Sequence, residues 1–383
     1  MEKKYIRFFK YASVDYMIDQ NGFFNFLEVN DNTFAPYFIE KKREIVERDR
    51  ASGNTITDLN KQHSKIFLSC FRRNINEGKH IAIICKKKGQ ESGIENEIQY
   101  IKALLNDNGF SAEIYTPEEF LINDGQLLVK DTGMKPDLIY RRNFSFPPLN
   151  LSLNTINDLY VRNVANDKFK ILNIVRSLES SFPILRVPET YKATSRKEIL
   201  DCIFFFQKKK EDCIVKPNCL YGGKGFLLIK YQEKKEEIYR KINEISLVEG
   251  GYIVQQKIEA AKFQSSDSNQ YYFDIRTMVY DGVMAGIEGR RSGMPVGENE
   301  EKSLITNIAQ NGVDLIVVSD QICKHRYAIR KMNCEEGMDK LDFKVDNNYL
   351  VLSPGYVENI RVLSEKIVEE IDSQISYERI GER

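Results

Sequence analysis

Three side chains that can offer oxygen ligands lie close together in residues 14–30. Two runs rich in apolar and aromatic residues flank an Asn-Gly pair, which strongly favours the turn of a β-hairpin. Asp15 lies on the first run, whereas Glu28 and Asn30 lie two apart on the second and therefore share one face. Folding the hairpin brings these oxygens together, and the set suits Mg²⁺ held against a nucleotide phosphate. On this stretch alone, a solvated hairpin with ordinary polar positions is an equal alternative.

A second constellation begins with Lys216, which ends a short apolar run. A loop with three glycines and Lys224 follows at residues 220–225. Glycines let backbone N–H groups turn toward anionic oxygens without a Cβ in the way, so a lysine beside such a loop suits nucleotide phosphates. The residues do not follow the order of a Walker A loop, and a simple tight turn is the equal alternative.

A third constellation is centred on Asp274 and Arg276, which share one face of a predicted strand. Arg290, Arg291 and Asn307 follow downstream. Arginines directed at one cleft can grip a phosphate or a carboxylate with two hydrogen bonds each. The alternative for this stretch is an ion pair on an exposed strand.

The elements that must position these residues alternate between short strands and helices, which predicts an α/β (α+β) fold. Residues 78–143 read as a small βαβ-type unit whose last strand ends in Arg141 and Arg142. Open α/β sheets bind ligands at the carboxyl ends of strands, so these arginines are candidates for a substrate carboxylate, with surface charge as the alternative. Residues 356–371 carry apolar side chains at helical spacing.

Composition excludes several classes of protein. The chain has 383 residues, with 56 Lys+Arg against 56 Asp+Glu, and this balance argues against wrapping a nucleic acid. It has no apolar run of membrane-spanning length and no secretory segment at its start. Seven cysteines without a Cys-x-x-Cys pair and three scattered histidines predict reduced thiols, a cytoplasmic location and no zinc site.

Taken together, the constellations resemble the ATP-grasp superfamily, particularly its glutathione synthetase-like and amino-acid ligase members. The matching features occur in the family's order: Lys216-Pro217, the glycine loop, residues 254–258, Phe273-Asp-Ile-Arg276, Arg290-Arg291 and Asn307. In that family the magnesium hairpin with its Glu-x-Asn comes last, whereas the matching Glu28-Val29-Asn30 stands near the start of this chain. The chain therefore resembles a circularly permuted ATP-grasp enzyme over residues 10–35 and about 160–372.

The resemblance implies a role for each matching residue. Asp15, Glu28 and Asn30 would hold two Mg²⁺ ions, with Mn²⁺ as an alternative, and Arg276, Arg291 and Asn307 would be catalytic. The implied ATP-binding residues are Lys168, Lys216, Tyr221, Gly222, Gly223, Lys224, Gly225, Gln256, Lys257, Ile258 and Glu259. Arg141 and Arg142 would bind a substrate carboxylate. Two features depart from the family: Gln256 stands where an acidic residue is usual, and residues 313–353 read as an insertion.

The resemblance also implies an organisation of the chain, with two α+β subdomains clasping ATP and a small preceding domain. The expected segments are the displaced hairpin part at 1–40, a helical connection at 41–77, the preceding α/β domain at 78–150, a linker and helix at 151–185, the nucleotide-binding subdomain at 186–255 and the carboxyl-terminal subdomain at 256–383. If the chain is permuted, residues 14–30 should pair with the strands around 273–290 and not with the sheet of residues 80–140.

The activity that the resemblance implies is an ATP-dependent carboxylate–amine ligase of small-molecule or peptide biosynthesis. It would form a C–N bond through an acylphosphate and release ADP and phosphate. The alternatives are a kinase that phosphorylates a small-molecule hydroxyl and a non-catalytic nucleotide-binding protein. The expected partners are a small carboxylate and an amine, free or carried on a protein or peptide. A nucleic acid or membrane partner is not expected, and a homodimer is left open.

Overall fold

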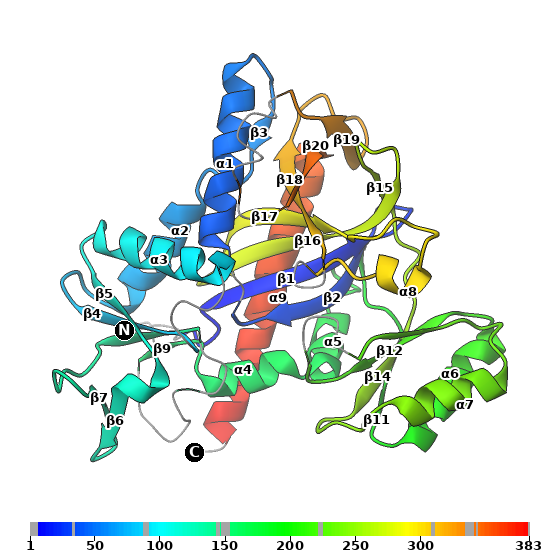
Figure 1. Cartoon of the computed structure of the whole chain (residues 1–383), viewed down its shortest axis with the longest axis horizontal. Helices are drawn as coiled ribbons and strands as arrows, with labels where there is room; N and C mark the ends of the chain where they lie inside the picture. The colour runs from blue at the N-terminus through cyan, green and yellow to red at the C-terminus, as the bar shows by residue number, and fades with distance from the viewer. Residues whose placement is uncertain are drawn as a thin grey trace.

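The computed structural model describes residues 7–32, 35–86, 92–142, 146, 154–220, 225–307, 311–333, 341 and 344–381. Most of these residues belong to one large sheet, to two four-stranded sheets and to the helices that cover them (Figure 1). Within these ranges, no helix combines the length and the apolar character needed to cross a membrane.

The large sheet is mixed and forms the centre of the molecule. Its strands are β1 (Tyr11–Ile18), β2 (Phe24–Asn30), β3 (Thr57–Asp58), β10 (Leu185–Arg186), β15 (Lys262–Gln264), β16 (Gln270–Tyr280), β17 (Val283–Arg291), β18 (Val313–Ser319), β19 (Tyr327–Lys331) and β20 (Val345–Leu352). They run in the order β10-β2-β1-β16-β17-β18-β20-β19, with β15 beside β16 and β3 beside β18. Strands from both ends of the chain therefore lie side by side.

The amino-terminal hairpin lies inside this sheet, between the edge strand β10 and β16. β1 pairs antiparallel with β2 on one side and with β16 on the other, so that Asp15 lies opposite both Glu28 and Arg276. The expected pairing of residues 14–30 with the strands around 273–290 is confirmed. The turn between β1 and β2 is held by Asp19, whose carboxylate accepts the backbone N–H groups of Asn21 and Phe23 at 2.8 and 3.0 Å. The origin of this order by circular permutation stays a prediction.

A 28-residue helix, α9 (Pro354–Gly381), runs across the large sheet (Figure 1). Side chains at helical spacing, including Ile360, Leu363 and Ile367, are completely buried against the sheet. The helix expected at 356–371 is confirmed and continues further. Its Asp372 carboxylate accepts the backbone N–H groups of Phe8 and Phe9 at 2.8 and 2.7 Å, which ties the start of β1 to the last helix.

The expected βαβ-type unit is also present. Its elements are β4 (His80–Ile84), α3 (Ser92–Asn106), β5 (Ser111–Tyr115), η1 (Pro117–Glu119), β6 (Phe120–Asn123), β7 (Gln126–Val129), β8 (Leu138–Arg141) and β9 (Thr155–Ile156). The order β5-β4-β8-β9 is parallel throughout, while β6 and β7 form a separate hairpin. Two helices, α1 (Pro36–Ala51) and α2 (His63–Asn74), lie between this unit and the large sheet. Buried Glu97 on α3 accepts backbone N–H groups at the start of α1, at 2.8 and 2.7 Å.

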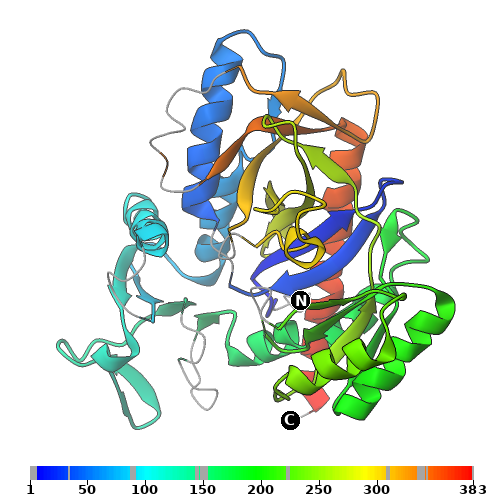
Figure 2. The same cartoon turned by 45° about the vertical axis from the view of Figure 1, so that its right-hand side comes forward.

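The third sheet is small and antiparallel. It consists of β11 (Thr190–Ala193), β12 (Cys213–Pro217), β13 (Leu227–Ile229) and β14 (Tyr252–Gln256), in the order β11-β14-β12-β13. Helices α6 (Arg196–Lys209) and α7 (Lys235–Glu244) pack on one face of it (Figure 2). Helices α4 (Leu159–Asn166) and α5 (Lys168–Arg176) lead into this sheet, and the short α8 (Glu300–Ser303) lies next to β13.

Residues 313–353, which read as an insertion, are integrated into the large sheet through β18, β19 and β20. Arg326 donates a hydrogen bond of 2.7 Å to the backbone carbonyl of Asn21 at the tip of the hairpin. This segment therefore helps to hold the hairpin in place. The division into six segments stays a prediction, and sheet membership crosses it at β10, which pairs with β2.

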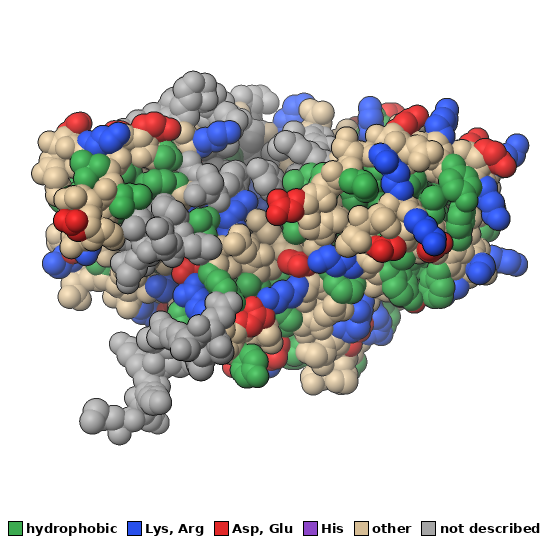
Figure 3. All heavy atoms as spheres, turned by 90° about the horizontal axis from the view of Figure 1, so that it is seen from below, with side chains coloured by type: hydrophobic (Ala, Val, Ile, Leu, Met, Phe, Trp, Pro, Cys, Tyr) green, Lys and Arg blue, Asp and Glu red, His purple; other side chains and the backbone are tan. Residues whose placement is uncertain are grey.

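The surface carries both signs of charge among apolar side chains on the face shown in Figure 3, in keeping with the zero net charge. The described cysteines are in no disulfide bond with one another: Cys70, Cys85, Cys202, Cys213, Cys219 and Cys323.

Candidate active site

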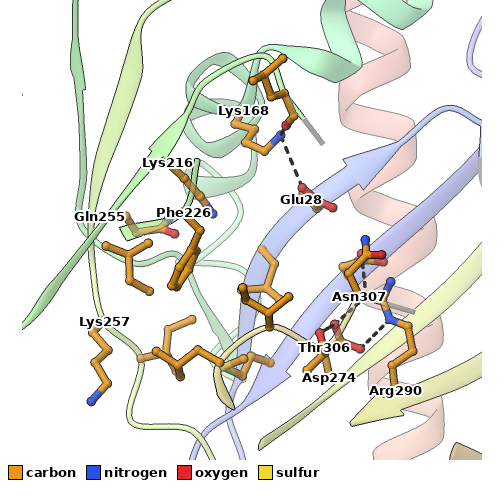
Figure 4. Close-up of a pocket in the computed structure, with 18 of the residues that line it drawn as sticks. Glu28, Lys168, Lys216, Phe226, Gln255, Lys257, Asp274, Arg290, Thr306 and Asn307 are labelled. Atoms are coloured by element: carbon orange, nitrogen blue, oxygen red, sulfur yellow. Dashed lines mark hydrogen bonds and ion pairs between the residues drawn. The ribbon is translucent and has the colours of Figure 1, made fainter. Parts of the chain in front are cut away.

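A pocket lies between the small sheet and the β1–β2 hairpin (Figure 4). The small sheet contributes Lys216 and apolar side chains such as Ile214 and Phe226. The large sheet contributes carboxylates, and the segment that follows α8 closes another side. The pocket therefore has an apolar part that can hold a flat ring and a charged end with lysines facing carboxylates.

The three predicted metal ligands converge at the charged end. The Asn30 side-chain nitrogen lies 3.3 Å from Glu28 Oε1 and 3.5 Å from Asp15 Oδ2. The partially positive NH₂ group of Asn30 therefore lies between the carboxylates of Asp15 and Glu28. The negative charge of these carboxylates would also attract a cation to this point. Among the described residues there is no group of three His, Cys, Asp or Glu suited to a metal. A divalent ion here would depend on the Asn30 amide and on oxygens of a bound nucleotide, which fits Mg²⁺.

Asp15 is embedded among arginines. Arg276 donates two hydrogen bonds to its carboxylate, at 2.7 and 2.6 Å, and Arg290 adds a third at 2.9 Å. Burial alone would raise the pKa of Asp15, but the two guanidinium groups hold this pKa below its usual range. Asp15 is therefore an ionised carboxylate, and Arg276 lies beside the predicted metal site.

Two lysines approach Glu28 from the opposite side (Figure 4). Lys168 opens α5, where the Asp167 side chain caps the helix, and its ammonium lies 3.5 Å from Glu28 Oε2. Lys216 stands near the end of β12. Burial lowers the pKa of Lys216 to about 8, with nearby Lys168 acting in the same direction and Glu28 against it. An anionic ligand in the pocket would be attracted by both ammonium groups.

The predicted phosphate loop is described only in part. Tyr221, Gly222, Gly223 and Lys224 lie outside the described residues. Gly225 has a φ of +70°, and a Cβ at this position would come within 2.9 Å of the Pro217 ring. Both observations require glycine at position 225.

Only some of the residues predicted to bind the adenine line the pocket. Lys257 and Ile258 line the pocket, but Gln256 and Glu259 do not, and Gln255 lines it instead. The reason is strand alternation on β14, which turns neighbouring glutamines to opposite faces. Gln255 is 2% exposed and donates a hydrogen bond of 2.9 Å to Thr190 Oγ1.

The tandem arginines of β17 differ from expectation. Arg291 does not line the pocket: its Nε donates to Asp346 at 2.7 Å, and its guanidinium lies 3.9 Å from the centre of the Tyr271 ring. Arg290 lies in the pocket wall, because the register places it opposite Asp274. Asn307 lines the pocket, and its catalytic role stays a prediction.

Arg141 and Arg142 do not line the pocket either. Arg141 is 2% exposed, forms an ion pair with Asp31 and donates to the backbone carbonyl of Asn157 at 2.7 Å. It therefore anchors the residue that follows Asn30. Buried Arg142 lies over the ring of Tyr140, 5.7 Å from its centre. A substrate role for Arg141 is at odds with this burial.

The pocket lining includes Thr306, Gln255 and Phe226, which the sequence analysis did not name, and Arg290, which it named in the third constellation without an individual role. Arg290 is next to Arg291, to which the resemblance gave a catalytic role. Only the register between β16 and β17 decides which of the two side chains reaches the pocket. Thr306 follows α8 in an irregular segment, where the sequence carries no periodic signal.

Two sheets that face each other across a pocket, with lysines on one side and a carboxylate hairpin on the other, define the ATP-grasp fold. This chain has that fold, as the sequence resemblance implied. It does so with the hairpin at the start of the chain and with α9 at the end.

Comparison with solved structures agrees. A candidate gamma-glutamylcysteine synthetase from Methylobacillus flagellatus superposes over 98% of this chain and 91% of its own, with a TM-score of 0.60 and 12% identity. A glutathione synthetase-like effector from Globodera pallida covers 74% of this chain and 72% of its own, with a TM-score of 0.47 and 10% identity. Only the first superposition is close enough to establish a shared fold. No protein-family model matches the chain, and there is no significant match among curated proteins.

Proposed function

We propose that this protein is an ATP-dependent carboxylate–amine ligase. The observation that carries the proposal is the charged end of the pocket, where Lys168 and Lys216 face Glu28 and Asp15 beside an apolar cavity. An apolar slot suits a nucleobase, and converging lysines suit its phosphates. The name of the Methylobacillus protein, a synthetase, is in keeping with this class.

The chemistry follows from charge. A carboxylate is a poor electrophile, so its oxygen first takes the γ-phosphoryl group of ATP, and ADP leaves. The amine nitrogen then attacks the carbonyl carbon, the C–O bond to phosphate breaks, and the nitrogen loses a proton. Lys168 and Lys216 would neutralise the phosphate oxygens, and Arg276 and Arg290, which both donate hydrogen bonds to Asp15, would stabilise negative charge that develops beside that carboxylate.

Asp15, Glu28 and Asn30 are the residues that would hold Mg²⁺. When bound, the ion would neutralise phosphate charge during phosphoryl transfer. The apolar wall and the glycine loop would exclude water, because an acylphosphate hydrolyses readily.

Product analysis tests the proposed reaction. Purified protein with Mg-ATP is screened against pairs of acids and amines, and ADP and phosphate are measured separately. A ligase releases both products only when acid and amine are present together. ADP without phosphate would indicate a kinase. Binding of Mg-ATP without any turnover over the whole screen would favour a binding protein, and absence of Mg-ATP binding would contradict all enzymatic functions considered.

Nucleotide affinity is expected to fall as the pH rises above about 8, where Lys216 loses its proton in the free protein. Bound phosphates favour the ammonium form, so binding above this pH must take up a proton. The affinity then decreases by up to about tenfold per pH unit. Calorimetric titration with ADP from pH 6.5 to 9.5 measures the effect. The matched variant Lys216→Arg keeps its charge throughout and should show a flat profile. A flat profile in the wild type would contradict the prediction.

A further inference from the structure

A chain of buried hydrogen bonds crosses the wall of the pocket. Thr306 donates to Asp274 Oδ2 at 2.5 Å, and Arg290 grips the same carboxylate with bonds of 2.9 and 2.5 Å. The Nη2 of Arg290, which donates to Asp274 Oδ2, also donates to Asp15 Oδ2 at 2.9 Å. Asp274 therefore joins two parts of the site that are far apart in sequence, the segment after α8 and the predicted metal hairpin (Figure 4).

The connection is almost completely shielded from water. Asp15 and Asp274 are each 1% exposed, Arg290 is 6% exposed and Thr306 is 7% exposed. Both oxygens of Asp274 are engaged by these partners, so its carboxylate is directed at protein groups although it forms part of the pocket wall. Burying such ionic groups is costly, and apolar residues of similar size would often be at least as stable. Stability alone therefore does not account for the buried ionic groups of Asp15, Asp274 and Arg290.

The segment that Thr306 belongs to is fixed at both ends. On one side, α8 is held by the small sheet and by the residue that follows β14: Glu301 accepts the backbone N–H of Leu228 at 3.1 Å, and Glu300 pairs with Lys257 at 3.1 Å. On the other side, Thr306 is held by Asp274. Between these points, Leu304 and Ile305 line the pocket. Losing the Thr306 contact would release the pocket wall on the side that faces Asp15.

We propose that Asp274 is a positioning residue that couples the nucleotide pocket to the metal hairpin. It orients Arg290 against Asp15, and through Thr306 it holds the 304–307 wall in register with that carboxylate. This inference rests on the proposed function, since it assigns nucleotide and Mg²⁺ to the two sides of the link. A residue with a purely structural role would change stability alone. A coupling residue changes the nucleotide affinity and the Mg²⁺ requirement together.

Thr306→Val tests the link with little change in volume. We expect the Kd for Mg-ADP and the half-saturating Mg²⁺ concentration each to rise about tenfold or more, because a hydrogen bond to a buried charged group is lost. Thr306→Ser keeps the hydroxyl and should restore both values. Ser303→Ala is the matched control, since that buried hydroxyl bonds the backbone carbonyl of Glu300 at 2.9 Å and does not reach Asp274. Asp274→Asn should give the same paired effect where it folds.

Calorimetry with Mg-ADP measures the Kd, and a Mg²⁺ titration of ADP binding measures the half-saturating Mg²⁺ concentration. Neither measurement needs a known substrate. A folded Thr306→Val protein with both wild-type values would overturn the inference while leaving the proposed function intact. A rise in only one of the two values would also overturn the coupling. Wild-type protein that binds neither Mg-ADP nor Mg-ATP would overturn the inference and the proposed function together.

Discussion

Glu28→Gln is expected to abolish turnover while leaving the fold intact. The side chain of Glu28 is 26% exposed, and it contacts the Asn30 amide at 3.3 Å and the Lys168 ammonium at 3.5 Å. Loss of its charge therefore leaves no deeply buried ion without a partner. It removes one of only two carboxylates in the predicted metal site. We expect turnover to fall by about 10²–10³-fold or more, the size seen when one group that stabilises transition-state charge is removed.

The measurement is ADP release with the acid and amine that support turnover, together with thermal unfolding. Glu378→Gln is the matched control, because this acid also pairs with a lysine of α5, at 2.7 Å to Lys170, and has 24% exposure, but it lies outside the pocket lining. Its activity should stay close to that of the wild type. Full activity in Glu28→Gln would contradict the assignment of Glu28 as a Mg²⁺ ligand.

Arg141→Met is expected to lower the stability of the fold rather than the affinity for a substrate. The side chains of Arg141 and Asp31 are 1% and 5% exposed, and among the described residues Arg162, at 3.4 Å, would remain to compensate the Asp31 carboxylate. Breaking a buried pair by removing one partner typically costs about 3–5 kcal/mol. The effect should appear as a clear fall in the midpoint of thermal unfolding, since Arg141 ties the βαβ-type unit to the end of β2.

Lys102→Met gives the comparison within the same unit. Lys102 and Glu113 form an ion pair at 2.7 Å whose side chains are 30% and 49% exposed. Exposed pairs contribute about 0–1 kcal/mol, so this variant should unfold near the wild-type temperature. The double variant Arg141→Met with Asp31→Leu should recover part of the loss, because the buried Asp31 carboxylate is then no longer left without its Arg141 partner. Unchanged stability in Arg141→Met with a raised KM would instead support the substrate role that the sequence suggested.

Much of the fold could be predicted from local patterns. The Asn-Gly turn and the alternation of Asp15, Glu28 and Asn30 predicted the hairpin and its shared face, because strand geometry repeats every two residues. The cyclic order of motifs predicted that the hairpin pairs with β16. The apolar spacing after position 356 predicted α9, although it continues beyond residue 371.

The remaining features depend on tertiary contacts that no local pattern contains. The choice between Arg290 and Arg291 follows from the register between β16 and β17, and one residue decides which side chain reaches the pocket. The choice between Gln255 and Gln256 has the same cause. Arg141 stands at a strand end that is typical of ligand sites, but Asp31 and Asn157 from other parts of the chain cover it. Thr306 acts through a partner 32 positions away.

The position of the hairpin at the start of the chain also affects when its strands can pair during synthesis and folding. Asp15 and its partner Arg276 are 261 positions apart, so at about 5–20 residues per second a ribosome needs roughly 13–52 s between synthesising the two. During this interval only β2, one of the two strands that pair with β1, has been synthesised, and the backbone N–H and C=O groups on the other edge of β1 lack their partners on β16. The pairing of β1 with β16 should therefore form late in synthesis. Refolding of the whole chain should be slow, as for other topologies dominated by contacts between distant segments.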